Sequence, residues 1–226
     1  FSGLRYKSQL GVDYVHETVE GSKILDSLAS IYHFSLFTQS SFELTNKLTT
    51  QFGIRLPFHS SYSANLIPSL HFKYDINTEN QLRLSYSRGF RSPTIKELFM
   101  EFIDINHNIV GNSDLKPERS NAFQLSLSLI PKINDKIYSS FNIEGLLNFL
   151  DNKIELARIQ NTDSYTYYNL EKSTYYGTNT FLKLDFKSHL NTVSSFNFMW
   201  NMFYIDNSSF NYNKPRHNLS LAYRFQ

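Results

Sequence analysis

The chain has no cysteine, which excludes disulfides, thiolate metal sites and cysteine nucleophiles. Charge is also scarce: 19% of the residues are charged, and the 22 basic and 20 acidic side chains are scattered along the sequence. The formal charge is only +2 and the sequence has no cluster of basic residues, so it lacks the positively charged surface with which proteins bind nucleic acids. We therefore expect no nucleic-acid partner.

Long apolar runs are absent as well. No run approaches the length of about 18 residues that a membrane-spanning helix needs. The sequence has no basic-then-apolar leader and opens on Phe1 rather than Met, so we expect any targeting segment to lie outside it. We interpret the chain as a piece of a longer or processed protein.

Aromatic residues are abundant, and they fall in alternating segments. Fifteen tyrosines and twenty phenylalanines favour strands. In 81–87 an apolar file, Leu82, Leu84 and Tyr86, alternates with a polar file, Gln81, Arg83, Ser85 and Ser87. This period of two predicts strands with one apolar and one polar face. About ten are expected, near 5–18, 28–44, 47–57, 64–76, 81–90, 120–131, 136–160, 164–187, 191–206 and 217–226.

A soluble sandwich and a membrane barrel both produce such alternation. Sandwich strands average about five or six residues, whereas several of these segments exceed the roughly nine to eleven residues with which a tilted strand crosses a membrane. The connections alternate between tight turns, near 45–47, 77–80, 133–136 and 188–192, and longer loops. Because short turns at one rim and long loops at the other are typical of outer-membrane barrels, the sequence predicts an all-β fold, an antiparallel transmembrane β-barrel.

The segment 88–119 is the longest break in this pattern, far beyond the usual connection of about two to six residues. Loops of this size are functional or disordered, and this one is apolar enough to fold onto the scaffold. Its part "SPTIKELFMEFI" begins with Ser92, Pro93 and a later Glu, as a helix start does, and Glu97, Glu101 and Asp104 have helix-like spacing. We expect a short helix in or over the barrel mouth. Its apolar side is expected to serve packing rather than cargo contact, and comprises Ile95, Leu98, Phe99 and Phe102.

Two short boxes in this segment carry a family resemblance. The first box reads Phe90, Arg91, Ser92, Pro93, and the second box reads Gly111, Asn112, Ser113, Asp114, Leu115, followed by Lys116, Pro117 and Glu118. In this order, between strands, they resemble the hallmark region of TonB-dependent outer-membrane receptors, which pairs a Phe-Arg-Ala-Pro box with an Asn-Pro-Asn-Leu box. This sequence departs from that pattern at Ser92 and Ser113. Segments on both sides resemble the family too, so the resemblance covers nearly the whole chain.

The resemblance implies that residues 1–226 are part of a receptor barrel domain, about ten strands of a barrel of about 22. An N-terminal plug domain, not present in this chain, would close the lumen. The implied location is the outer membrane of a Gram-negative bacterium, in contact with its lipid. The implied activity is uptake of a scarce small-molecule cargo such as an iron–siderophore, haem or cobalamin. The TonB complex would drive uptake through the plug, and a surface lipoprotein is a candidate partner. No resident cofactor is expected, because haem would be cargo.

Three residues are candidate ligand contacts. His107 lies between the boxes, where haem-uptake members of the family carry a haem-contacting His, and an imidazole can ligate ferric haem iron. The alternative is a structural role in a turn with Asn106 and Asn108. Arg88 and Arg91 can hold an anionic ligand through two-pronged hydrogen bonds, or they can pair with Asp or Glu of a neighbouring loop. Asn112 and Pro117 are expected to fix loop geometry.

Two other functions stay open on sequence alone: a passive porin-like or adhesive barrel of about ten strands, and an outer-membrane hydrolase. Asp104 and His107, with Ser113 nearby in sequence, do not specify a base oriented next to a nucleophile. No enzyme activity and no catalytic residue are therefore expected. No metal site is expected either, because the other histidines show no close pair in the sequence: His16, His33, His59, His71, His189 and His217.

Overall fold

Ten long antiparallel strands form one sheet in the computed structural model of the chain. The structure describes residues 5–63, 65–105, 108–134, 137–187, 193–207 and 216–225. The long strands are β1 (Arg5–Glu20), β2 (Leu28–Glu43), β3 (Leu48–His59), β4 (Ile67–Asp75), β5 (Gln81–Arg91), β8 (Glu118–Leu129), β10 (Ile137–Arg158), β11 (Tyr165–Lys187), β12 (Val193–Asn207) and β13 (Arg216–Phe225). They pair as nearest neighbours in chain order. All ten strands predicted from the alternation are confirmed, with bounds that differ by a few residues.

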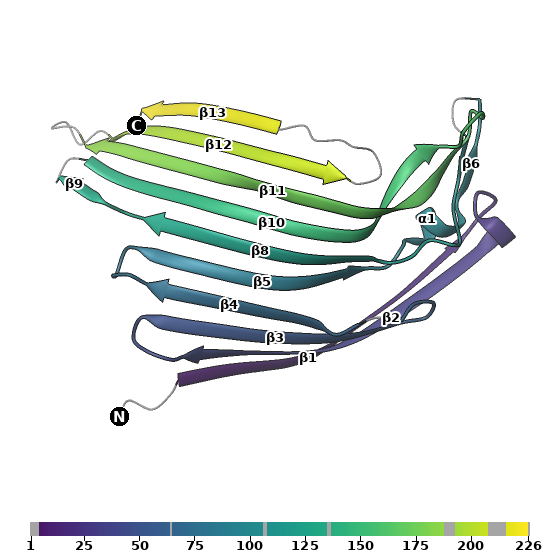
Figure 1. Cartoon of the computed structure of the whole chain (residues 1–226), viewed down its shortest axis with the longest axis horizontal. Coiled ribbons are helices and arrows are strands. Elements are labelled where there is room, and N and C mark those ends of the chain that lie inside the picture. Colours follow the sequence, from purple (N-terminus) through teal and green to yellow (C-terminus); the bar gives the residue numbers. More distant parts are fainter. Residues whose placement is uncertain are drawn as a thin grey trace.

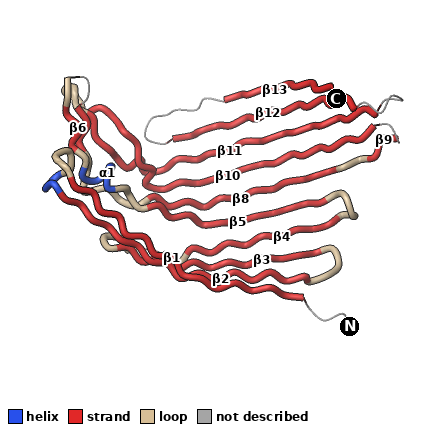
Figure 2. Tube along the Cα trace, turned by 180° about the vertical axis from the view of Figure 1, so that it is seen from behind, coloured by secondary structure: helices blue, strands red, loops and turns tan. Residues whose placement is uncertain are grey.

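The sheet is bent into a trough, and the start of β1 and the end of β13 lie near the same rim (Figure 1). At that rim tight turns join β2 to β3 and β4 to β5. The opposite rim carries the longer connections, including residues 92–117 with the short helix drawn in blue in Figure 2. The asymmetry between short turns and long loops is therefore as predicted for the described connections. Residues 135 and 136 of the turn predicted at 133–136, the turn at 188–192 and most of the loop at 207–216 lie outside the described residues.

The strand register keeps the apolar files on one face of the sheet. Leu84 lies opposite Phe72 on β4 and opposite Leu125 on β8. On β1, Leu10 and Tyr14 are 81% and 63% exposed. Rows of exposed apolar side chains, rather than single ones, suit a surface that meets lipid. We call this the outer face, and the opposite, concave face the inner face.

Buried hydrophobic side chains among the described residues are few, and most belong to the long loop and its contacts. Ala29, Ile31 and Ile95 form one cluster, and Leu98, Leu115 and Ile154 form another. A soluble sandwich would instead bury the apolar faces of its strands between two sheets. Packing in this structure therefore fixes the loop on the wall, while the apolar face of the wall stays open.

Several short elements complete the fold. Between β5 and β8 the chain forms α1 (Ile95–Phe99), β6 (Glu101–Ile103) and β7 (Asn108–Val110). β6 and β7 form a hairpin, and β7 also adds in parallel to β11. The 3-10 turn η1 (Leu25–Ser27) precedes β2, and β9 (Lys132–Asn134) pairs with β10. Within the described residues, no helix has the length and apolar character needed to cross a membrane.

Candidate functional site

Helix α1 begins the long loop at the rim, and a reciprocal cap fixes its start. The Glu97 N–H donates to Thr94 Oγ1 at 3.2 Å, and the Thr94 N–H donates to Glu97 Oε2 at 2.8 Å. This capping box satisfies two backbone donors that a helix start otherwise leaves unpaired. The predicted helix is confirmed, but its cap is Thr94 rather than Ser92. It ends at Phe99, so the helical spacing inferred for Glu101 and Asp104 is wrong.

Arg91 of the first box holds two carboxylates on the inner face. Its Nε and Nη2 donate to the two oxygens of Glu118 at 2.8 and 2.7 Å, and its Nη1 donates to Glu97 Oε2 at 2.9 Å. Glu118 follows the second box at the start of β8, and its Oε1 also accepts from the Ile154 N–H at 2.7 Å. One guanidinium group thus joins the first box, α1 and the strand that follows the second box.

The Glu97 carboxyl is held in its charged form. Burial acts to raise its pKa, but the hydrogen bonds and charge of Arg91, together with the Thr94 hydrogen bonds, outweigh burial and lower the pKa. Two carboxylates against one guanidinium leave the group negative as a whole. Of the two roles considered for Arg91, the structure therefore shows pairing with neighbouring Glu residues, and ligand contact by Arg91 stays a prediction.

Gly111 of the second box lies against the backbone of α1. Its N–H donates to the Met100 carbonyl oxygen at 2.7 Å. A Cβ added to Gly111 would lie 2.6 Å from both the carbonyl carbon and the carbonyl oxygen of Leu98. Since these are backbone atoms that cannot rotate away, the close approach of the second box to α1 requires glycine here.

Asn112 connects the second box to two other elements. Its N–H donates to the Glu97 carbonyl oxygen at 2.8 Å, and its side-chain amide donates to the Tyr167 carbonyl oxygen of β11 at 2.9 Å. Its Oδ1 accepts from the Asp114 N–H at 2.9 Å, which shapes the turn that follows. These contacts agree with the loop-fixing role expected for Asn112.

The remaining residues of the two boxes differ in how far their side chains are buried. Pro93 and Leu115 are buried, and Leu115 packs with Leu98 and Ile154. Phe90 and Ser92 are partly buried, whereas Ser113 and Asp114 are exposed at the turn. Pro117 is also buried. The apolar members therefore anchor the loop, while the turn of the second box faces solvent.

Arg88, a second candidate ligand contact, lies on the other face of the wall from Arg91. Arg88 stands opposite Asn121 on β8 and shares the outer face with Tyr86, so alternation turns it away from Arg91. His107 and Asn106 lie outside the described residues. The ligand roles of Arg88 and His107 remain predictions.

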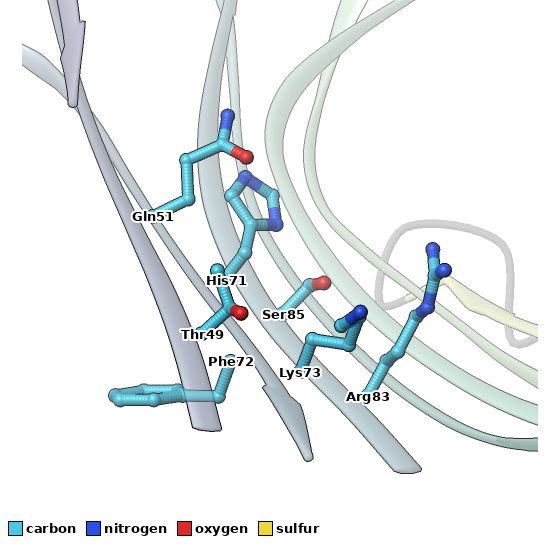
Figure 3. Close-up of a pocket in the computed structure, with 7 residues that line it drawn as sticks. All are labelled: Thr49, Gln51, His71, Phe72, Lys73, Arg83 and Ser85. Atoms are coloured by element: carbon cyan, nitrogen blue, oxygen red, sulfur yellow. The ribbon is translucent and has the colours of Figure 1, made fainter. Parts of the chain in front are cut away.

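The inner face carries a polar hollow of about 320 Å³ on β3, β4 and β5. In Figure 3 its polar side chains project into the trough, whereas Phe72 points away from them. Lys73 pairs with Asp75 at 3.0 Å, while Arg83 donates to Gln81 and has no carboxylate partner within the described chain. The hollow thus offers a partly uncompensated positive charge, and its polar lining residues are Thr49, Gln51, His71, Lys73, Arg83 and Ser85.

Antiparallel pairing also brings together two histidines that are distant in sequence. His33 lies opposite His59, and their ring centroids are 6.4 Å apart. They line a smaller hollow of about 230 Å³ together with Asp13, Arg55 and Arg91. Among the described residues, no group of three or more His, Asp or Glu is arranged to hold a metal ion. No pattern in the sequence indicates this pair of histidines, because strand register rather than sequence spacing creates it.

Known proteins resemble this chain in sequence and in fold. A family model described as "TonB dependent receptor-like, beta-barrel" matches residues 3–226. The iron-regulated outer membrane virulence protein of Vibrio cholerae serotype O1 is 29% identical over 124 residues, which are 52% of this chain and 19% of that protein.

Solved structures share the fold at low identity. A mutant ferric enterobactin receptor of Pseudomonas aeruginosa, in complex with enterobactin, superposes with a TM-score of 0.74 at 18% identity and covers 99% of this chain and 37% of that one. The hemophore receptor HasR of Serratia marcescens, in complex with its hemophore and heme, gives 0.72 at 14% identity, with coverages of 97% and 46%. The siderophore receptor PirA of Pseudomonas aeruginosa gives 0.69 at 16% identity, with coverages of 97% and 43%. The chain spans less than half the length of each of these proteins.

Proposed function

Because this chain belongs to the TonB-dependent receptors of the Gram-negative outer membrane, we propose that it forms part of the barrel wall and of the barrel mouth in a transport receptor. The cargo of this receptor is a ferric chelate. The family consists of transport receptors and not of enzymes, which agrees with the expectation from sequence. Membership also favours a receptor over the porin-like barrel and the hydrolase. Transport here means capture of cargo at the long-loop rim and its passage along the inner face.

The observation that carries this proposal is the contrast between the two faces of the wall. The loop 92–117 is fixed at the long-loop rim by Arg91, and the inner face of the wall is polar and carries Lys73 and Arg83 towards the short-turn rim. Ferric chelates whose iron is held by carboxylate or catecholate oxygens are anionic, so an uncompensated guanidinium such as that of Arg83 attracts them. The names of the similar proteins, a ferric enterobactin receptor and a siderophore receptor, support the same class of cargo.

Uptake of radioactive iron by whole cells tests the proposal. Cells that lack their own iron receptors would express the full-length receptor that contains these 226 residues, with and without a functional TonB complex. We expect uptake of one class of ferric siderophore that depends on TonB, and a fall of about tenfold in Arg83→Ala. The control is Lys47→Ala, a cation of the neighbouring β2–β3 turn that donates to the Ile76 carbonyl oxygen and does not line the hollow, and it should leave uptake unchanged. Absence of TonB-dependent iron uptake with every siderophore class would contradict the proposal.

Haem is the second candidate cargo. It is favoured by the fold shared with HasR, whose structure contains heme, and by the position of His107 between the two boxes. Haemin titration of the detergent-solubilised full-length receptor, followed by its absorbance band, should show axial ligation that is lost in His107→Ala. Unchanged binding in that variant would exclude His107 as the ligand.

The coupling partners are part of the same proposal. TonB would act through a plug domain supplied by the full-length receptor, and a surface lipoprotein would deliver cargo to the long-loop rim. Co-purification of the full-length receptor with TonB, strengthened by cargo, is the expected result.

A further inference from the structure

Charged residues of the wall are concentrated on the inner face, but one group lies on the outer face at the long-loop rim. It consists of Arg88 on β5, Arg119 on β8, Asp151 on β10 and Lys172 on β11, four strands that are neighbours in the sheet. The register sets Arg119 opposite Asp151, and Asp151 opposite Lys172. Three cations against one carboxylate make this patch of the outer face positive.

Arg88 and Arg119 have no ion pair with any residue that the structure describes, unlike Arg91 on the inner face. The Nε of Arg119 is buried and has no hydrogen-bond acceptor. A buried donor without an acceptor costs free energy, and a guanidinium facing the membrane needs an anionic partner or water. The outer face therefore presents two guanidinium groups that can accept an anion.

An aromatic pair lies directly below these arginines. Tyr86 and Phe123 contact each other with ring centroids 5.0 Å apart, and the Tyr86 hydroxyl donates to Asn121 at 3.0 Å. Aromatic girdles mark the boundary between hydrocarbon and headgroups in outer-membrane barrels, whose long loops are extracellular. The arginines are thus placed at headgroup depth in the outer leaflet.

An apolar hollow of about 390 Å³ continues down the same face. At this hollow Gly145 of β10 lies opposite Leu125, and glycine has no side chain to fill the space. A Cβ built on Gly145 would meet no atom within 4 Å. Along β8, Leu125 and Arg119 are about 20 Å apart at about 3.3 Å per residue. Half of the hydrocarbon core of a membrane measures about 15 Å, so this distance spans half of the core and the start of the headgroup region. The side chains around the hollow include Leu84, Phe123, Leu125, Leu147 and Tyr176.

We propose that Arg88, Arg119 and the hollow at Gly145 form a binding site for a phosphorylated glycolipid of the outer leaflet. The two guanidinium groups hold a phosphate through charge-assisted hydrogen bonds. One acyl chain lies in the hollow. Asp151, an acceptor beside Arg119, suits the hydroxyl groups of a sugar headgroup.

Lipid titration of the delipidated full-length receptor, followed by native mass spectrometry, tests this site. The probes are phosphorylated lipid A, its dephosphorylated counterpart and phosphatidylglycerol. We expect phosphorylated lipid A to bind most tightly, and its affinity to fall by about tenfold or more in the double variant Arg88→Ala/Arg119→Ala. The matched control is Lys7→Ala, a cation that alternation places on the inner face of β1, and it should bind like the wild type.

A second variant separates the hollow from the charges. Gly145→Leu fills the hollow on a lipid-facing position, so the barrel should fold, as checked by its heat-dependent mobility on a gel, while lipid A binding weakens. Equal affinity of the double variant and the wild type would overturn the site. Phosphatidylglycerol binding as tightly as lipid A would overturn the assignment to a glycolipid.

Discussion

Arg91 and Glu118 face each other on the last rung between β5 and β8 and share two hydrogen bonds, at 2.8 and 2.7 Å. The chain leaves the wall after Arg91, forms α1 and the β6–β7 hairpin, and returns at Glu118. The ion pair therefore closes the loop at its base. Glu97 extends the pair onto α1, so the two ends of the loop and its helix depend on one side chain.

Arg91→Lys should loosen the loop although it keeps the charge. A single ammonium cannot reproduce the forked contact with Glu118 and also reach Glu97, so we expect a local loss of about 2 kcal/mol. Hydrogen exchange of segment 92–117 should be faster in this variant than in the wild type. Arg83→Lys, in the wall of the same strand, serves as the control and should leave exchange of the loop unchanged.

Gly111→Ala should displace the second box from α1. The new methyl group would approach the Leu98 backbone at 2.6 Å, so the backbone must shift and the hydrogen bond from Gly111 to Met100 should weaken. A cost of about 1–3 kcal/mol is expected from such overpacking. Limited proteolysis should cut the loop more readily, whereas Gly145→Ala, with open space at the site, should resemble the wild type.

Asn169→Ala should destabilise the bend of β10. The Asn169 side chain accepts from the Lys116 N–H at 2.7 Å and donates to the Lys116 and Asn152 carbonyl oxygens at 2.8 Å. Asn152 has a left-handed backbone, with φ 56°, which needs such support. We expect a loss of about 2 kcal/mol, measured as a lower unfolding temperature of the receptor. The control is Asn148→Ala, which removes a side-chain oxygen that is buried without a hydrogen-bond partner, and it should lower the unfolding temperature less. An equal fall in both variants would contradict this role of Asn169.

The attachment of α1 should weaken in acid. Because the pKa of Glu97 is lowered in the folded protein, its ion pair contributes fully above the ordinary pKa of 4.5, and the contribution is lost as the pH falls through the lower, folded-state pKa. Hydrogen exchange of α1, corrected for the intrinsic effect of pH, should rise in that range. Glu97→Gln should remove this part of the pH dependence, and an unchanged profile in the variant would assign it to another group.

Local patterns predicted much of this fold. Alternation of Leu82, Leu84 and Tyr86 with polar neighbours is a property of the strand itself. The strand can therefore be predicted without knowing which strands pair with it. The same parity puts Arg88 on the outer face and Arg91 on the inner face, so the alternation by itself separates these two candidate ligand contacts. The helix was likewise recognisable, although Thr94 rather than Ser92 proved to be its cap.

The contacts of the site depend on register and could not be predicted in this way. His33 meets His59 only because β2 and β3 pair with one particular offset. Glu97 and Glu118 reach Arg91 from different elements, and the sequence offered several other acidic residues nearby. The hairpin of β6 and β7 is too short for alternation to be visible.

The parallel addition of β7 to β11 has a consequence for the order of folding. Asn108 donates to Ser164 across 56 residues of sequence, and Ile24 bridges to Met100 on the other side of the same hairpin. Contacts this distant carry a high loop-closure cost, which is recovered only after the intervening strands have paired. The hairpin should therefore dock late, after β10 and β11 have assembled, and a refolding receptor should pass through a state with a complete wall and an open mouth.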